Sequence, residues 1–206
     1  MALKFITFEG GEGSGKSTII NLLVERLTKE GYKVISTREP GGVSVSEQIR
    51  NVILNKENTM SNETEALLYA ASRIEHLNKK VLPYLNEGYI VISDRYLDSS
   101  LAYQGVARGL GIEDVLKVNM YATKYMPIRT YFFDVTPDVG LKRIEGRDKI
   151  DRLDLESMSF HEKVYQGYLE LLKLYPDRIK RIDGKKDINS IFEIVYQDIL
   201  KVINND

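Results

Sequence analysis

With 206 residues, the chain is long enough for one domain with a sizeable core and too short for two comfortable ones. Its formal net charge is −1, without the basic excess of most nucleic-acid-binding proteins, so we expect no nucleic-acid partner. The absence of cysteine excludes disulfides, iron–sulfur clusters and thiolate metal sites. The opening residues lack a signal-peptide pattern and no apolar run would span a bilayer, so we expect a cytoplasmic protein with no membrane segment.

Short apolar runs alternate with segments of helical period along the chain. Four runs rich in β-branched and aromatic residues predict strands, and a fifth is weaker: residues 5–8, 33–36, 89–93, 130–133 and 178–182. Their near-continuous apolar character is typical of strands covered on both faces, as in parallel sheets. The alternation predicts an α/β three-layer fold, a five-stranded parallel sheet flanked by helices, in a single domain over 1–206.

Two helices are indicated most clearly. After the first strand, Ile20, Leu23, Val24 and Leu27 share one helical face, and Gly31 stands where a C-terminal glycine is common. The C-terminal segment repeats this pattern from Ile188 to Ile203. Both stripes are interpreted as core packing.

A phosphate-binding loop follows the first strand. The residues are Gly10-Gly11-Glu12-Gly13-Ser14-Gly15-Lys16-Ser17, followed by Thr18. They match G-x-x-x-x-G-K-[ST], in which glycines let backbone N–H groups converge on phosphate oxygens. The helix N-terminus turns its partial positive charge toward the same anions. Lys16 is expected to reach the outer phosphates and Ser17 to ligate Mg²⁺, so the loop predicts an ATP site.

The loop alone does not separate a kinase from a GTPase, a motor or an ATP-driven transporter subunit. The Asn-Lys-x-Asp and Asp-x-x-Gly motifs of GTPases are missing, and so is a transporter signature of the Leu-Ser-Gly-Gly-Gln type. Arginines instead follow the predicted strands: Arg38 after the second, Arg95 after the third, and Arg147 and Arg152 in a polar loop after the fourth. Ligands of open α/β sheets bind at that edge.

Such a cluster suits a transfer between two phosphorylated substrates. A phosphate acceptor with a second pKa of about 6 is largely dianionic at neutral pH, so it needs no general base. It needs positioning and charge neutralisation by Mg²⁺, Lys16 and arginines. The sequence supplies these cations and shows no catalytic base, because His76 and His161 are isolated on helical segments and are expected to be structural or at the surface.

Longer motifs carry a resemblance that covers nearly the whole chain. They are Phe8-Glu9-Gly10, Thr37-Arg38-Glu39-Pro40-Gly41-Gly42, Ala70-Ala71-Ser72-Arg73 with Glu75-His76, Asp94-Arg95-Tyr96, and Ser99-Ser100-Leu101-Ala102-Tyr103-Gln104-Gly105. With these motifs the chain resembles the thymidylate kinases. The resemblance implies transfer of the γ-phosphoryl group of ATP to dTMP, with Mg²⁺, in a homodimer.

The resemblance also implies roles for individual residues. Arg38 and Arg95 would hold the acceptor phosphate, Asp94 would orient Mg²⁺ and its waters, and Glu12 would accept a hydrogen bond from the 3′-hydroxyl of dTMP. The other implied acceptor contacts are Tyr69 stacking on thymine, Arg73 and Gln104 bonding its polar edge, Ser100 near the base, Tyr103 crowding the 2′ position, and Arg50 and Arg108 at the acceptor site.

Within this family a catalytic arginine lies either in the phosphate loop or in a closing lid. The loop position here is Gly13, so the resemblance is to the bacterial type with the arginine in the lid, at about 143–156. Arg147 or Arg152 would then contact the transition state, and Arg143 would pack on adenine. Two alternatives stay open: the same chemistry on dUMP or a purine monophosphate, and a nucleotide-binding regulator with little turnover.

Overall fold

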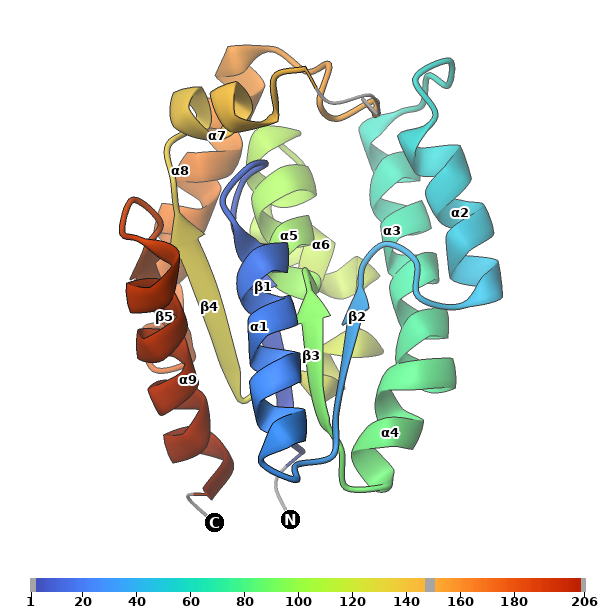
Figure 1. Ribbon diagram of the computed structural model, residues 1–206. Helices are drawn as coiled ribbons and strands as arrows, with labels where there is room; N and C mark the ends of the chain where they lie inside the picture. Colours follow the sequence, from blue (N-terminus) through green and yellow to red (C-terminus); the bar gives the residue numbers. More distant parts are fainter. Residues whose placement is uncertain (1–2, 147–150, 205–206) are drawn as a thin grey trace.

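The protein is described from a computed structural model that covers residues 3–146 and 151–204. All five predicted strands are present within one or two residues of their expected bounds: β1 (Phe5–Glu9), β2 (Val34–Arg38), β3 (Ile90–Asp94), β4 (Arg129–Asp134) and β5 (Ile179–Asp183). They form one parallel sheet in the order β2-β3-β1-β4-β5 (Figure 1). The predicted fold class is therefore confirmed.

Helical segments connect consecutive strands. The α-helices are α1 (Lys16–Lys29), α2 (Ser44–Leu54), α3 (Asn62–His76), α4 (Leu82–Asn86), α5 (Leu97–Ser100), α6 (Ile112–Val118), α7 (Pro137–Ile144), α8 (Met158–Leu174) and α9 (Ile188–Asn204). Two π-helical segments, η1 (Leu77–Val81) and η2 (Leu101–Ala107), continue α3 and α5, and a 3₁₀ segment, η3 (Ala122–Tyr125), precedes β4. None of the helices within 3–146 and 151–204 is long and apolar enough to cross a membrane.

The helices cover the two faces of the sheet as separate layers. Successive strand residues point to opposite faces, so Phe8 and Tyr131 pack with α1 and α9, whereas Phe5 and Phe132 pack with α8 and the segments around η2. Burial on both faces explains the apolar runs of β1, β3 and β4. Strand β2 lies at the sheet edge and is only partly buried.

The two helical predictions hold with one exception. Helix α1 buries Ile20, Leu23 and Leu27, and Gly31 follows its end with φ +86°. Helix α9 buries most of its predicted face, but Ile188 is 53% exposed and does not belong to the core as expected. Ile188 is the first residue of α9, one turn before Ile191 reaches the sheet, so the helical period overstates its burial.

Candidate active site

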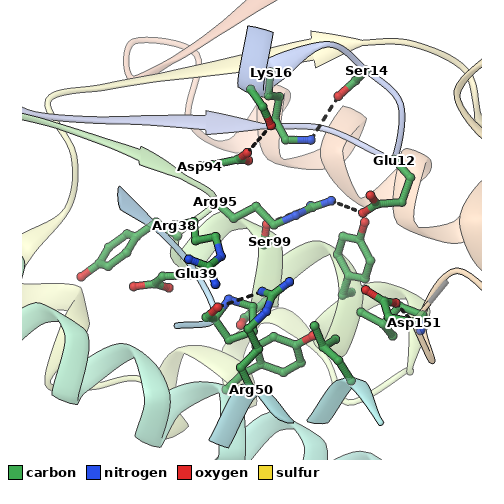
Figure 2. Close-up of a pocket in the computed structure, with 18 of the residues that line it drawn as sticks. Glu12, Ser14, Lys16, Arg38, Glu39, Arg50, Asp94, Arg95, Ser99 and Asp151 are labelled. Atoms are coloured by element: carbon green, nitrogen blue, oxygen red, sulfur yellow. Dashed lines mark hydrogen bonds and ion pairs between the residues drawn. The ribbon is translucent and has the colours of Figure 1, made fainter. Parts of the chain in front are cut away.

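One cavity opens at the C-terminal edge of the sheet, where β1, β2 and β3 end (Figure 2). Its volume is about 350 Å³. Sixteen of the residues singled out from the sequence line it: Glu12, Gly13, Ser14, Gly15, Lys16, Ser17, Thr18, Arg38, Arg50, Tyr69, Arg73, Asp94, Arg95, Ser100, Tyr103 and Gln104. Glu39, Pro40, Leu54, Tyr96, Ser99, Asp151 and Leu153 complete the lining.

The phosphate loop forms one end of this cavity. Helix α1 begins at Lys16 without a side-chain cap, which leaves its first N–H groups available to an anion. The Lys16 ammonium donates to the carbonyl oxygens of Gly10 (3.0 Å) and Gly11 (3.1 Å) and to Ser14 Oγ (3.1 Å). Burial lowers the pKa of Lys16. The carbonyl groups of Gly10 and Gly11 thus hold the lysine side chain in place, and these two glycines do not line the cavity.

Two side-chain oxygens, from Ser17 and Asp94, lie close together beside the phosphate loop. Ser17 Oγ donates to Asp94 Oδ2 at 2.9 Å (Figure 2). Across the described residues, no group of three or more His, Asp or Glu side chains is placed to hold a metal ion. Mg²⁺ is usually bound by one or two protein oxygens, with substrate phosphates and water completing the octahedron. A hydroxyl and a carboxylate next to a phosphate loop fit that ion.

Arg95 is the central cation of the cavity. It follows β3 with φ +72°, an unusual conformation for a non-glycine residue, and its guanidinium forms an ion pair with Glu12 (Figure 2). It also donates to Ser99 Oγ (3.3 Å) and Tyr168 Oη (3.2 Å), and lies over the ring of Tyr103 at 5.2 Å. Burial alone would lower the pKa of Arg95, but the charges around it, Glu12 included, raise it well above its ordinary value. It remains a cation.

Beneath Arg95 lies the buried carboxylate of Glu9, which belongs to the Phe8-Glu9-Gly10 motif but has no role assigned from the sequence. Glu9 accepts hydrogen bonds from Tyr96 N (2.8 Å), Tyr168 Oη (2.9 Å) and Ser99 Oγ. Burial, helped by the charge of Asp98, raises the pKa of Glu9 to about 7. The signal that could have indicated Glu9 in the sequence is a carboxylate at the end of an otherwise apolar strand. Because Ser99 and Tyr168 also contact Arg95, Glu9 supports the arginine indirectly.

Two further arginines enter from the β2 side. Arg38 is half exposed and forms an ion pair with Glu47 at 3.0 Å. Arg50, on α2, donates to the carbonyl oxygen of Pro40 at 2.9 Å. Burial lowers the pKa of Arg50, and the nearby charge of Arg38 adds to the effect. Figure 2 shows both side chains directed toward the cavity, where Arg38 and Arg50 join Arg95 among the lining residues.

Arg73 is held rigidly at the other end of the cavity. Only 1% of it is exposed, and it donates to Glu39 (2.8 Å), Asn119 (2.6 Å) and Ser100 Oγ (2.9 Å). The second oxygen of Glu39 contacts His76 Nδ1 at 3.1 Å. The sequence did not indicate Glu39 or Asn119 as partners, since they lie 34 and 46 positions from Arg73. His76 is a buried structural residue, and His161 is also buried rather than on the surface.

Aromatic side chains complete this end. Tyr69, one helical turn before Arg73 on α3, and Tyr103, on η2, are both buried and line the cavity. Burial raises the pKa of each phenol, so both stay neutral. Gln104 follows Tyr103 on the same π-helical segment, a type of irregularity common at functional sites.

Of the predicted arginines that the structure describes, Arg108, Arg143 and Arg152 are not among the lining residues. Arg143 donates to the carbonyl oxygens of Gly13 (3.3 Å) and Gly184 (3.2 Å), at the outer side of the phosphate loop. Arg108 and Arg152 contact other side chains at the rim, described below. Arg147 lies outside the described residues.

Comparison with known proteins gives a consistent result. A family model described as thymidylate kinase matches residues 8–195. A thymidylate kinase from Clostridium novyi is 52% identical over 195 residues, covering 93% of this chain and 95% of the relative. One from Bacillus velezensis is 53% identical over 204 residues, covering 97% and 94%. A crystal structure of thymidylate kinase from Ehrlichia chaffeensis, 35% identical, superposes with a TM-score of 0.76 over 97% of both chains. The chain belongs to the thymidylate kinase family.

Proposed function

We propose that this protein transfers the γ-phosphoryl group of ATP to dTMP, giving ADP and dTDP for the synthesis of dTTP. The observation that carries the proposal is a single cavity with a phosphate loop at one end and a rigid polar and aromatic pocket at the other. Arg38, Arg50 and Arg95 lie between these ends. Two phosphorylated nucleotides can therefore meet in line, with cations around the transferred group.

ATP would bind at the phosphate loop. The backbone N–H groups of Gly13 to Thr18 and the Lys16 ammonium would hold its phosphates, and Arg143 would pack against adenine. Ser17 and Asp94 would hold Mg²⁺, which supplies neutralisation of the negative charge on the phosphates. Lys16 already lies close to the loop carbonyls, so its charge is kept beside the phosphates by the fold itself.

The acceptor would occupy the opposite half of the cavity. Arg38 and Arg95 would hold its phosphate, which attacks as a dianion without a base, and Arg50 would support them. Glu12 would accept from the 3′-hydroxyl. Binding of the acceptor phosphate to Arg95 then competes with the Arg95–Glu12 ion pair, which frees the carboxylate for the sugar.

The base would lie between Tyr69 and the polar end. Tyr69 would stack on thymine, Arg73 and Gln104 would bond its edge, and Ser100 would lie near it. Tyr103, whose position is fixed by η2, would crowd a 2′-hydroxyl and favour deoxyribose. The burial of these side chains supports a shaped pocket rather than a surface patch.

A lid at about 143–156 would close over the two nucleotides. Asp151 and Leu153 already line the cavity, which supports this assignment. Closure excludes water, which otherwise competes with dTMP as acceptor. Arg147 or Arg152 would neutralise charge in the transition state, as Gly13 leaves the phosphate loop without an arginine.

We also propose that the protein is a homodimer acting in the cytoplasm. Exposed apolar side chains on α2 and α3, which pack together, support a self-association surface: Val45 (48%), Val52 (47%) and Leu67 (57%). If they form it, Val52→Glu should convert a dimer into monomers in light scattering. A wild-type monomer would contradict this part of the proposal.

The activity is tested by ADP release with MgATP and, in parallel, dTMP, dUMP, dGMP, AMP or no acceptor. We expect turnover to be selective for dTMP. Arg95→Ala should lower it by a factor on the order of 10² to 10³, whereas Arg26→Ala, an exposed arginine of α1, serves as the matched control. Turnover with another monophosphate would refute the assigned base pocket, and ATP binding without acceptor-dependent turnover would refute the kinase proposal.

A further inference from the structure

Outside the cavity lining, one buried carboxylate links Gln104, at the end of the cavity proposed for the base, to Arg108 and Arg152. Glu65, on α3, is 1% exposed and accepts from four donors. These are Gln104 Nε2 (2.8 Å), Arg108 Nε (3.2 Å) and Nη2 (3.1 Å), and Arg152 Nη2 (2.5 Å). None of the roles assigned above uses Glu65.

The position of Glu65 follows from the helix that carries it. Glu65, Tyr69 and Arg73 are spaced four residues apart on α3, so they form one stripe facing the same side. Tyr69 and Arg73 line the cavity, and Glu65 continues the stripe to Gln104 on η2. The carboxylate therefore lies directly behind the pocket proposed for the base.

Glu65 is ionised despite its burial. Desolvation alone would raise its pKa, but hydrogen bonds from Arg108, Gln104 and Arg152 outweigh it, and the pKa of Glu65 is lowered. An ionised carboxylate can only accept hydrogen bonds. The side chain that meets it must therefore present a donor.

This requirement fixes the amide of Gln104. An amide has a donor end and an acceptor end that differ little in shape, and either could face the cavity if the surroundings were indifferent. Here Nε2 must turn to Glu65, and among the described residues the Gln104 side chain makes no second hydrogen bond. Since Gln104 lines the cavity, its amide oxygen is the atom left to meet a ligand.

The base end then presents one acceptor and one donor. Arg73 makes four side-chain hydrogen bonds, through Nε, Nη1 and twice through Nη2, which leaves one of its five N–H groups. A keto pyrimidine has a carbonyl oxygen next to an imino N–H, which complements a donor beside an acceptor. Cytosine has an amino group and an unprotonated ring nitrogen there, so both contacts would be mismatched.

We propose that Glu65 is a positioning residue that sets base specificity: it holds the Gln104 amide oxygen toward the cavity and so selects a keto pyrimidine over cytosine. The inference rests on the proposed function, because it concerns the acceptor of that reaction. Its action is indirect, through Gln104, and that dependence can be measured.

The test is a double-mutant cycle on the ratio of kcat/KM for dTMP to kcat/KM for dCMP. Wild type should strongly prefer dTMP. Glu65→Gln no longer dictates the amide orientation, so we expect the ratio to fall about tenfold, the loss of roughly one hydrogen bond. In a Gln104→Leu background the same change should leave the ratio within about twofold, because the group it orients is gone.

Glu156→Gln is the matched control. Glu156 belongs to the same cluster through Arg108 and does not contact Gln104. As a residue of the proposed lid it would affect turnover of both acceptors alike, so the ratio of the two kcat/KM values should equal that of wild type even if turnover itself changes. If Glu65→Gln does not fold, as judged by circular dichroism, Glu65→Asp keeps the charge while withdrawing it from Gln104, and the ratio should fall in the same direction.

The outcomes separate the two proposals. If wild type phosphorylates neither nucleotide, the proposed function fails and the inference fails with it. If wild type phosphorylates dTMP but the folded Glu65 variant keeps the wild-type ratio, the role of Glu65 is refuted and the function stands. An equal fall of the ratio in the Gln104→Leu background, or in Glu156→Gln, also refutes an action of Glu65 through Gln104.

Discussion

Replacement of Glu9 by Gln should make the protein more stable in alkaline solution and change little in acid. Burial raises the pKa of Glu9 from 4.5 to about 7, so ionising this group in the folded protein is unfavourable. Its stabilising contribution is fully present below pH 4.5, where it is protonated in both states, and is lost as the pH rises through about 7. Glutamine keeps the shape and cannot ionise.

The size of the effect follows from the pKa difference. A shift from 4.5 to about 7 corresponds to about 3 kcal/mol in the free energy of unfolding, of which about 2.5 kcal/mol falls between pH 5 and pH 8.5. The glutamine amide also presents an N–H donor where one oxygen of Glu9 accepts from Ser99 and Tyr168. This mismatch lowers the free energy of unfolding of the variant by an amount that does not depend on pH. The difference between variant and wild type should therefore grow with pH whatever its starting value.

The assay is urea unfolding followed by circular dichroism at about pH 5 and about pH 8.5, for wild type and Glu9→Gln. Glu162→Gln, an exposed position on α8, controls for the loss of a charge. A Glu9→Gln difference that is the same at both pH values, or that shrinks in alkali, would refute a raised pKa of Glu9. Equal denaturant slopes are required for the comparison.

Three further predictions concern the lid, the fold and the metal. The double variant Arg147→Ala, Arg152→Ala should lower turnover by a factor on the order of 10³ with ATP binding largely retained, and unchanged turnover would contradict the proposed lid role. Asp98 is buried and receives both Nη groups of Arg178, at 2.6 and 2.8 Å. Asp98→Asn should lower the free energy of unfolding in urea by about 3 kcal/mol, and a loss well under 1 kcal/mol would contradict this estimate. Ser17→Ala should raise the Mg²⁺ concentration for half-maximal turnover, and an unshifted titration would argue against Ser17 as a ligand.

The sequence predicted those parts of the molecule that depend on local pattern. Strands β1, β3 and β4 were predicted within one or two residues because burial on both faces makes them apolar throughout. The phosphate loop was predicted because its backbone adopts positive φ angles, which favour glycine and so leave a local pattern in the sequence. Sixteen of the assigned residues line one cavity, largely because the chain returns to the same sheet edge after each strand.

What the sequence did not predict depends on contacts between distant segments. Glu9, Glu39, Glu65 and Asp98 are buried carboxylates with partners far along the chain, and a charged residue gives no periodic signal of burial. The strand order was not predicted either, since local composition does not specify neighbours. Arg152 was proposed only as a lid cation, yet in the structure it also contacts the carbonyl oxygen of Ile53 (2.8 Å).

The close approach between the phosphate loop and α7 limits how this enzyme can change. At Gly13, φ is +65° and an added Cβ would collide with the backbone of Gly140, while a Cβ at Gly140 would collide with the carbonyl of Glu12. The two glycines therefore exclude side chains from each other's position. An arginine cannot enter the loop at position 13 by one substitution, because α7 would have to move first. If the catalytic arginine lies in the lid, as proposed above, its transfer to position 13 of the loop would require coordinated change at both Gly13 and Gly140.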